Sequence, residues 1–456
     1  MSGALETMRA WDPMTRVDPT LTSEPNDLGD TAITPSVTPV LVPASRYTSR
    51  DFAELEEERL WPHVWQIACT VDHVPEPGDF YEYRCGRLSV IVVRGDDGSL
   101  RAFQNVCRHR GNSICQGSGS GLECLRCPYH HWTWDLEGAL REVPSRKGFG
   151  PGLRNEDFGL FRVQVDTWGP LVFVNLDLTA APLDVFLEGL VDDSAWAQLD
   201  EFHAAATTIT PVQSNWKVVA EGFSETYHVQ GIHPEMLGSI DDVHAPQRLW
   251  GLHGASYQHY GVASPRLGRA SSDDDVWRSF VESQGGRMGI TDPETPLPPI
   301  PPGQTVRDVI AEQIRQDQAS SGVDLSGYST EQITRLCQYN LFPNVTVLVQ
   351  ADMVTAIIAR PGATVDDAEF VLISLRRSAP GAKVPRAADI VVEDPTYLGL
   401  VMSQDCTLLR TAQRGLHQPG LEYLAISSEE CRIINLHRNL ERHLGIVPSE
   451  LRPIGA

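Results

Sequence analysis

Residues Cys107–Trp132 concentrate side chains that bind soft metals. These 26 positions hold four of the nine cysteines and three of the fourteen histidines in the chain. The stretch divides into Cys107-x-His109 and, after seventeen intervening residues, Cys127-x-x-His130. Each half offers one thiol and one imidazole on a short loop, and the glycine-rich segment 117–121 lets the two loops face each other. The pattern predicts a metal site rather than packed core residues.

Two kinds of metal suit this donor set. Two thiolates and two imidazoles can hold a tetrahedral zinc, or an iron–sulfur cluster with both cysteines on one iron and both histidines on the other. A zinc site can also be drawn from a second set, Cys124, Cys127, His130 and His131. The Cys124-x-x-Cys127 pair matches a redox dithiol, but the surrounding βαβ pattern is missing. Spacing alone leaves zinc and iron–sulfur open.

A second group of metal ligands lies in the segment Asn215–Met236, whose beginning is helical in pattern. His228 and His233 are five residues apart, which on a continuous helix separates the side chains by about 140°. We therefore expect the helix to break between them, at Gly231 and Pro234. Two imidazoles and one carboxylate on one face leave positions open for O₂ and substrate, which is typical of oxygen-activating Fe(II).

Several carboxylates are candidates to complete or orient this second site. Glu393, Asp394 and Asp405 all follow the second histidine by more than 150 residues. Asp394 precedes a proline, which suits a turn or an N-cap role. Asp405 begins a helical pattern, for which an N-cap role is the alternative. Glu225 precedes His228 by three residues, so on a helix it can accept the ring N–H and fix the tautomer. The alternative for Glu225 is a solvated surface carboxylate.

Composition limits the setting in which these sites act. A chain of 456 residues predicts two domains. The formal charge of −23 disfavours nucleic acid and anionic membranes as partners. The N-terminal residues lack a signal-peptide pattern and no apolar stretch reaches 18 residues, so we expect a soluble cytoplasmic protein. In that compartment clustered cysteines bind metal rather than form disulfides.

The hydrophobic pattern predicts the elements that must position the ligands. We divide the chain into an extended arm (1–45), a first domain (46–180) and a second domain (181–456) that contains a polar insertion at about 262–332. The expected elements are a helix from Ser49 to Leu60, strands in 87–107 around a Gly95–Gly98 turn, a strand in 169–177, strands in 345–350, 354–360 and 369–377, and a helix to Leu444 capped by Ser427 and Glu430. No helix or strand is expected for the proline-rich segment 295–303.

The first ligand stretch resembles the Rieske [2Fe–2S] motif. The matching residues are Cys107, His109, Cys127, Pro128, Tyr129, His130 and Trp132. The chain from about residue 47 is similar, in the order of its parts, to the alpha subunits of Rieske non-heme iron oxygenases, the aromatic ring-hydroxylating dioxygenase family. The resemblance implies an α+β fold, with a small β-rich Rieske domain and a catalytic domain whose antiparallel sheet grips a helix.

The resemblance also assigns roles. It implies that Cys107, His109, Cys127 and His130 bind the cluster and that His228, His233 and Asp405 bind a mononuclear Fe(II), since Asp405 is followed by Gln413, Arg414 and Gly415 as in the family. It implies that Glu225 links His228 to His130 of a neighbouring subunit in a homotrimer, or in an α3β3 assembly. Two positions depart from the family pattern, Gly222 in place of Asn and Arg410 in place of Glu.

The implied activity is that of the terminal oxygenase of a multicomponent system. It would hydroxylate, cis-dihydroxylate or oxidatively dealkylate a small aromatic organic substrate with O₂. No G-x-G-x-x-G follows a predicted strand, so we expect NAD(P)H to act through a separate ferredoxin or flavin reductase. The alternatives are an electron carrier that uses only the cluster, and a zinc-binding structural protein.

Overall fold

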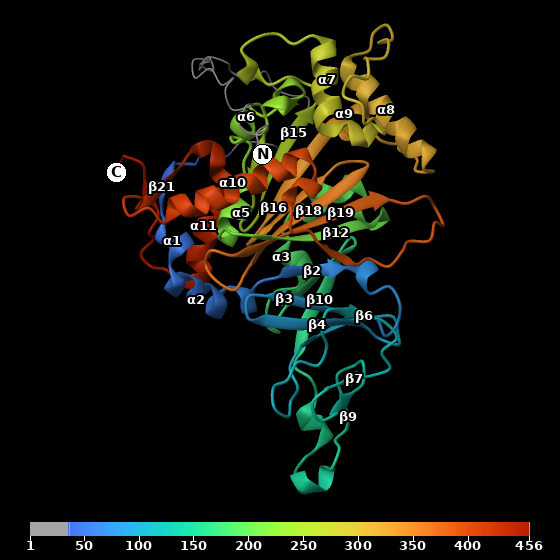
Figure 1. The fold of residues 1–456 in the computed structure, drawn as a ribbon, viewed down its shortest axis with the longest axis vertical. Coiled ribbons are helices and arrows are strands. Elements are labelled where there is room, and N and C mark those ends of the chain that lie inside the picture. Colours follow the sequence, from blue (N-terminus) through green and yellow to red (C-terminus); the bar gives the residue numbers. More distant parts are fainter. Residues whose placement is uncertain (1–34, 36, 456) are drawn as a thin grey trace.

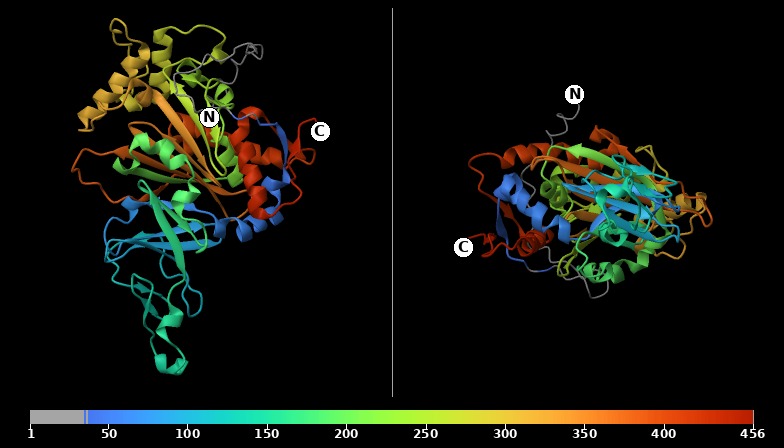
Figure 2. Two further views of the ribbon diagram at one scale, coloured as in Figure 1. Left: turned by 180° about the vertical axis from the view of Figure 1, so that it is seen from behind. Right: turned by 90° about the horizontal axis from the view of Figure 1, so that it is seen from below.

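The structure, a computed structural model, describes residue 35 and residues 37–455. Three parts follow one another along the long axis of the molecule, and the views from the front and from behind show the same order (Figures 1 and 2). A β-rich domain lies at one end, a large sheet covered by helices lies in the middle, and a helical cap lies at the other end. The predicted α+β class is confirmed.

The β-rich domain is built on a seven-stranded sheet, in which every paired strand is antiparallel. Its strands, in spatial order, are β2 (Gln66–Thr70), β11 (Leu171–Asn175), β10 (Arg162–Trp168), β5 (Leu100–Gln104), β4 (Leu88–Arg94), β3 (Phe80–Cys85) and β6 (Ser118–Gly119). The predicted strands on either side of the Gly95–Gly98 turn are β4 and β5, and both are confirmed. A separate small sheet of β7 (Leu125–Arg126), β8 (Thr133–Trp134) and β9 (Leu140–Glu142) extends to the tip of the domain (Figure 1).

The central sheet belongs to the second domain. Its strands, in spatial order, are β13 (Ile240–Asp241), β15 (Gly254–Tyr260), β16 (Arg335–Leu341), β17 (Val345–Val349), β18 (Met353–Pro361), β19 (Ala368–Arg377), β12 (Phe202–Val212) and β20 (Asp389–Val391), with β14 (Gln247–Leu249) beside β15. All pairs are antiparallel except β12 with β20. The three predicted strands are β17, β18 and β19, and they lie side by side as expected.

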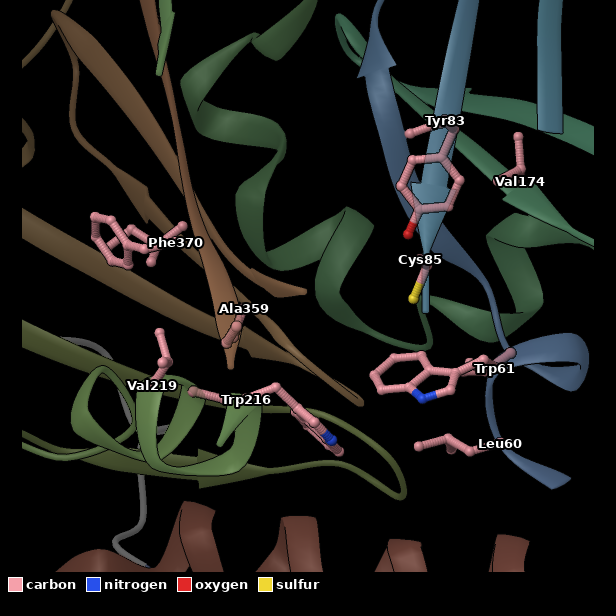
Figure 3. Close-up of a cluster of buried hydrophobic side chains, with 14 of the residues drawn as sticks. Leu60, Trp61, Tyr83, Cys85, Val174, Trp216, Val219, Ala359 and Phe370 are labelled. Atoms are coloured by element: carbon pink, nitrogen blue, oxygen red, sulfur yellow. The ribbon is translucent and has the colours of Figure 1, made fainter. Parts of the chain in front are cut away.

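Helix α5 (Trp216–Gly222) packs on this sheet and matches the expected helix gripped by the antiparallel sheet of the catalytic domain. Its Val219 faces Phe370 and Ala359 of the sheet, and the indole of Trp216 is directed toward Trp61 (Figure 3). The same core continues into the first domain, because Trp61 meets Trp216 with ring centroids 5.0 Å apart. The first and second domains therefore share one hydrophobic core, and the contact between them is apolar rather than solvated.

The N-terminal segment joins the second domain. Helix α2 (Arg50–Arg59) begins at the Ser49 cap and confirms the predicted helix. Residues 1–34 and 36 of the expected arm lie outside the described residues. The end of that segment is not a separate arm, because β1 (Val40–Pro43) pairs with β21 (Tyr423–Ile426) and β22 (Arg452–Pro453). Val40 and Val42 alternate toward a buried face, and this period-two pattern is what a paired strand requires.

The polar insertion forms the helical cap. It contains α7 (Asp273–Gln284), α8 (Val306–Ser320) and α9 (Thr330–Thr334), with short 3₁₀ turns at Pro265–Leu267 and Gly285–Met288. Apolar side chains on one side of these helices, among them Trp277 and Ile310, build a separate core. Residues 295–303 form no helix or strand, as predicted.

The C-terminal part returns to the central sheet. It contains a 3₁₀ turn (Pro395–Leu398), α10 (Leu400–Leu416), a second turn (Ser428–Glu430) and α11 (Cys431–Leu444). The predicted Ser427–Glu430 capping box is present, but it caps the 3₁₀ turn that leads into α11. The remaining short elements are α1 (Ser45–Thr48), α3 (Leu183–Phe186), α4 (Leu190–Ser194), α6 (Val229–Ile232) and 3₁₀ turns at 61–63, 71–73, 146–149, 155–158, 195–197, 199–201 and 234–238. Among the described helices, none has the length and apolar character needed to cross a bilayer.

Candidate metal centres and substrate cavity

His228, His233 and Asp405 converge on one point. Each offers one ligand atom, and these atoms lie within 4.8 Å of one another. His228 precedes the short helix α6 and His233 follows it, while Asp405 lies in the second turn of α10. The helix begins at Leu400, so the N-cap alternative for Asp405 is wrong. Asp394 takes the predicted cap role, because its carboxylate accepts the backbone N–H of Thr396.

The backbone brings the two histidines together in a way that differs from the expected helix break. Helix α5 ends at Gly222, a loop follows, and the single turn α6 (Val229–Ile232) lies between the histidines. The chain leaves helical geometry at His233, where φ is −121° and ψ is 54°. Gly231 lies inside this turn, so the prediction of a break at Gly231 was wrong, whereas the helical geometry does end directly before Pro234, the second predicted position. One short turn with a histidine at each end places the two rings 5.4 Å apart between centroids.

Glu225 contacts His228 from the loop before α6 rather than from a helical face. Its Oε1 lies 2.6 Å from Nδ1 of His228, and its Oε2 accepts the backbone N–H of the same residue at 2.9 Å. Burial lowers the pKa of His228, but the hydrogen bond and charge of Glu225, with Asp405 and Asp242, outweigh it and the net pKa is raised. The contact leaves Nε2 of His228 free to face a metal.

His233 is held by two neighbours on α10. Its Nδ1 lies 2.8 Å from Oε1 of Gln404, and its Nε2 lies 3.0 Å from Oδ1 of Asp405. An amide oxygen can only accept, so Gln404 fixes the hydrogen on Nδ1 and leaves Nε2 as the ligand atom. Sequence reasoning missed Gln404. The available signal was its position directly before Asp405.

A cavity of about 320 Å³ opens beside these three residues. The wall comes from the α5–α6 region, β15, β16, β17, α7 and the start of α10, and it comprises Phe223, Glu225, Thr226, His228, Val229, His233, Met236, Ile240, Gln258, Tyr260, Glu282, Ser283, Gln284, Leu336, Gln338, Leu348, Leu398, Gly399, Leu400, Val401, Met402 and Asp405. Glu282, Ser283 and Gln284 belong to the insertion. An apolar wall with a few polar groups suits a small organic molecule.

The two positions that depart from the family pattern lie on helices α5 and α10. Gly222 is the last residue of α5, and a Cβ added there would meet no atom within 4 Å. A Cβ would therefore fit at this position without displacing its surroundings. Arg410 is exposed on α10.

The four ligands of the first stretch sit on two loops with matching backbone geometry. Cys107 accepts the N–H of Gly111 and Cys127 accepts the N–H of His131, both at 3.0 Å. The backbone N–H of each cysteine also donates to the carbonyl oxygen of the residue five positions later. These acceptors are Asn112, at 2.8 Å, and Trp132, at 2.9 Å. Two similar loops therefore present one cysteine and one histidine each.

The side chains of these loops form two pairs. The thiol of Cys107 lies within hydrogen-bond reach of Cys127, and the rings of His109 and His130 are 4.6 Å apart between centroids. Trp132 stacks on His109 with an interplanar angle of 3°. Nδ1 of His109 is buried and has no hydrogen-bond partner among the described residues, which suits a metal ligand. Burial raises the pKa of Cys107, and a bound metal would reverse this by stabilising the thiolate.

This pairing fits a two-iron cluster better than one zinc ion. A tetrahedral site needs all four ligand atoms around one point. Among the described residues, the only group of three or more metal-binding side chains with mutually close ligand atoms is His228, His233 and Asp405. The first-stretch set and the Cys124 set both fail this condition, whereas separate cysteine and histidine pairs meet the needs of a cluster with one pair on each iron.

Comparison with known proteins assigns each of the two domains to a known family. The sequence profile of the family described as "Ring hydroxylating alpha subunit (catalytic domain)" matches residues 195–446, and that of the "Rieske [2Fe-2S] domain" matches residues 64–162. The oxygenase subunit of glycine betaine monooxygenase from Chromohalobacter salexigens is 35% identical over 45% of this chain and 46% of its own length. The alpha subunit of biphenyl 2,3-dioxygenase from Rhodococcus jostii is 33% identical over 48% of this chain and 52% of its own length. These matches therefore span about half the length of each relative.

Solved structures share the fold. A quaternary ammonium Rieske monooxygenase superposes with a TM-score of 0.64 at 19% identity, covering 89% of this chain and 95% of the other. Naphthalene 1,2-dioxygenase from Rhodococcus sp., solved with indole, gives a TM-score of 0.58 at 18% identity, covering 90% of this chain and 95% of the other. The architecture is common to relatives whose substrates differ.

Proposed function

The chain belongs to the ring-hydroxylating alpha subunit family, and from this premise we propose that it is the terminal oxygenase of a multicomponent Rieske system. The observation that carries the proposal is the convergence of His228, His233 and Asp405 at the wall of a cavity of substrate size. A mononuclear Fe(II) supplied with electrons from a [2Fe–2S] cluster would provide O₂ activation there. The expected products are hydroxylated or oxidatively dealkylated forms of a small organic substrate.

The protein groups around the iron have separate roles. Nε2 of His228, Nε2 of His233 and the carboxylate of Asp405 would hold Fe(II) on one face. Glu225 and Gln404 keep the Nδ1 hydrogens of the two rings in place, so that the lone pairs of Nε2 stay directed at the metal. The apolar part of the wall excludes water from the reacting carbon of the substrate.

The first stretch would supply the cluster ligands. Cys107 and Cys127 would bind one iron as thiolates, and His109 and His130 would bind the other as neutral imidazoles. The unpartnered Nδ1 of His109 supports this assignment. Burial and the positive charge of the neighbouring Arg110 lower the pKa of His130, and this favours the neutral ring that a metal requires.

The placement of the two sites supports a homotrimer. The tip of the first domain, with β7 and β9, lies at one end of the molecule, and α6 and α10 lie well toward the other (Figures 1 and 2). A cluster from a second copy, docked beside Glu225, would shorten the path that electrons must travel. The neighbouring Tyr227 is 50% exposed, so a partner can reach this surface. In this assembly Glu225 would link His228 to His130 of the partner subunit.

Electrons would come from a separate ferredoxin or flavin reductase that uses NAD(P)H. The relatives act on quaternary ammonium compounds and on arenes, so an aromatic substrate for this chain stays a prediction.

Hydroxylation of a C–H bond consumes O₂, two electrons and two protons, and releases water with the alcohol. At a carbon bonded to nitrogen or oxygen, the alcohol then breaks down, which is oxidative dealkylation.

The experiment that tests the proposal is metal analysis with an optical spectrum, on protein purified without oxygen. We expect about three irons per chain, two in the cluster and one at the triad, and a red-brown colour that bleaches with dithionite. Protein with a reductase should then consume O₂ and form a hydroxylated product. One zinc and a colourless sample would contradict both sites, and a coloured protein that never consumes O₂ with any substrate would indicate an electron carrier.

A further inference from the structure

Two buried polar side chains on strand β15 line the cavity and lack partners there. Gln258 and Tyr260 are only 5% and 3% exposed, and both belong to the cavity wall. Alternate residues of a strand point to the same face, so these two side chains share one wall, with their Cα atoms about 7 Å apart. Oε1 of Gln258 and the hydroxyl of Tyr260 form no hydrogen bond with any residue that the structure describes, and neither atom is shut off from the cavity.

Neighbouring groups fix the orientation of the Gln258 amide. Nε2 of Gln338 donates to the carbonyl oxygen of Phe223, which can only accept, so Oε1 of Gln338 points the other way. This Oε1 accepts from Nε2 of Gln258 at 2.9 Å, and Nη1 of Arg432, which can only donate, lies 3.5 Å from it. Gln258 therefore turns its NH₂ group toward Gln338 and leaves Oε1, an acceptor, for the cavity.

Tyr260 adds a donor beside this acceptor. Burial raises the pKa of Tyr260 to about 12, so its hydroxyl stays protonated at neutral pH and can donate. A buried polar atom without a partner costs free energy, and most such atoms in proteins are hydrogen-bonded. A bound molecule that offers a donor and an acceptor on one group would satisfy both side chains.

The chemistry of the wall indicates that this group is uncharged. An anion would place its oxygen against Oε1 of Gln258, which can only accept. A cation would lie in front of the guanidinium of Arg432, which stands directly behind Gln338. The carboxylates of Glu225 and Asp405 are hydrogen-bonded to the two histidines and face the proposed Fe(II), so they are already engaged. A buried charge without a counter-charge is costly, and a neutral group avoids this cost.

We propose that Gln258 and Tyr260 form a polar subsite for a hydroxyl or primary amide group of the substrate. The O–H or N–H of that group would donate to Oε1 of Gln258, and its oxygen would accept from the hydroxyl of Tyr260. The proposal rests on the proposed function, which makes this cavity the substrate site. A group held at β15 would orient the rest of the molecule toward His228 and His233 on the same cavity wall.

Equilibrium dialysis tests the subsite without depending on turnover. Iron-loaded protein is equilibrated in sealed cells without oxygen, with benzyl alcohol or with ethylbenzene, in which a methyl group replaces the hydroxyl. We expect the alcohol to bind about tenfold more tightly, because the hydrocarbon leaves both side chains unpaired. Equal affinity, tighter binding of ethylbenzene, or binding of neither compound would overturn the proposal.

Two variants remove the polar ends of the side chains and keep their approximate size. Gln258→Met and Tyr260→Phe should each lower the ratio of alcohol to hydrocarbon affinity by about tenfold. The matched control is Tyr257→Phe, because the Tyr257 hydroxyl lies on the same strand but donates to Asp193 outside the cavity. A wild-type ratio in either cavity variant, or an equal loss in the control, would contradict the subsite. The comparison in unaltered protein decides if a variant does not fold.

Benzylammonium tests the uncharged character of the group, since it carries the same ring with a cation in place of the hydroxyl. We expect it to bind less tightly than benzyl alcohol at pH 7. Tighter binding of the cation would overturn the assignment of a hydroxyl or amide.

The outcomes for this subsite and for the proposed function are separable. Oxygenation of a hydrocarbon by a protein that does not prefer the alcohol would overturn the subsite and keep the oxygenase. A preference that depends on Gln258 and Tyr260, in a protein that oxygenates nothing, would support the subsite and contradict the oxygenase.

Discussion

The carboxylate of Glu225 binds His228 twice, through the ring Nδ1 at 2.6 Å and through the backbone N–H at 2.9 Å. The side chain therefore fixes both the ring and the start of α6. Replacement by glutamine keeps an oxygen acceptor but removes the charge that would attract the partner subunit's histidine. We expect Glu225→Gln to retain both metals and to lose most of its steady-state turnover. Rate measurements with excess reductase test this.

A single-turnover experiment separates the possible causes. If Glu225 serves electron transfer between subunits, pre-reduced Glu225→Gln should also form little product, although its iron content is normal. A wild-type steady-state rate in this variant would remove the bridge from the mechanism.

The triad should be separable from the cluster. Asp405→Ala removes the carboxylate that contacts His233 Nε2, so we expect iron to fall from about three to about two per chain, with turnover abolished and the cluster spectrum unchanged. The matched control is His244→Ala, because His244 pairs with Asp241 and does not belong to the triad. Loss of cluster colour in Asp405→Ala would show that the two sites are not independent.

Gln404 should act as a positioning residue for His233. In Gln404→Leu the Nδ1 hydrogen of this buried ring loses the acceptor that Gln404 provides, so we expect Fe(II) affinity to fall by about 10–100-fold. Chelator competition measures the affinity directly. Gln404→Glu restores an acceptor at the same position and should recover iron binding. A purely structural role for Gln404 would lower stability in both variants and leave their iron affinities equal.

Asp389 of the second domain forms hydrogen bonds to the first domain, and their contribution to the free energy of unfolding depends on pH. It accepts hydrogen bonds from Tyr81 at 2.7 Å and from His73 at 3.2 Å, both in the first domain. Burial raises the pKa of Asp389, but these partners outweigh it and the net pKa lies below the ordinary value of 3.8. A depressed folded pKa contributes stability above 3.8 and loses it as the pH falls through the folded value.

We therefore expect Asp389→Asn to lower the free energy of unfolding at pH 7 by about 1–2 kcal/mol. Denaturant titrations should show the difference from wild type narrowing only below pH 3.8. Glu393→Gln, in the same segment, is the control and should match wild type. A difference that stays constant down to pH 2 would contradict the charge argument.

Features set by neighbouring residues were predicted well from the sequence. The helix after Ser49, the strands β4 and β5 and the three strands from Val345 follow from a cap, a glycine turn and apolar runs. The backbone conformation near His228 was harder to predict. Five-residue spacing excluded a straight helix, but it did not distinguish a break at Gly231 from a single turn that begins at one histidine and ends at the other.

Contacts between distant residues could not be predicted from spacing. Glu393, Asp394 and Asp405 were equivalent on residue type alone, and family resemblance was needed to choose among them. In the structure α10 carries Asp405 and Gln404 to His233, about 170 residues away in the chain. In the same way, no local pattern predicted that Val40–Pro43 pairs with Tyr423–Ile426.

By itself, the sequence determined which side chains can bind metal and how each ligand loop is built, because in each loop the cysteine and the histidine are only two or three residues apart, Cys107 with His109 and Cys127 with His130. Only the tertiary structure decided which groups meet: the two cysteines, the two histidines, the triad, and Gln258 with Gln338. Local geometry follows from short-range sterics and hydrogen bonds. Contacts between residues far apart in the chain depend instead on how α7, α10 and the central sheet pack around one shared core.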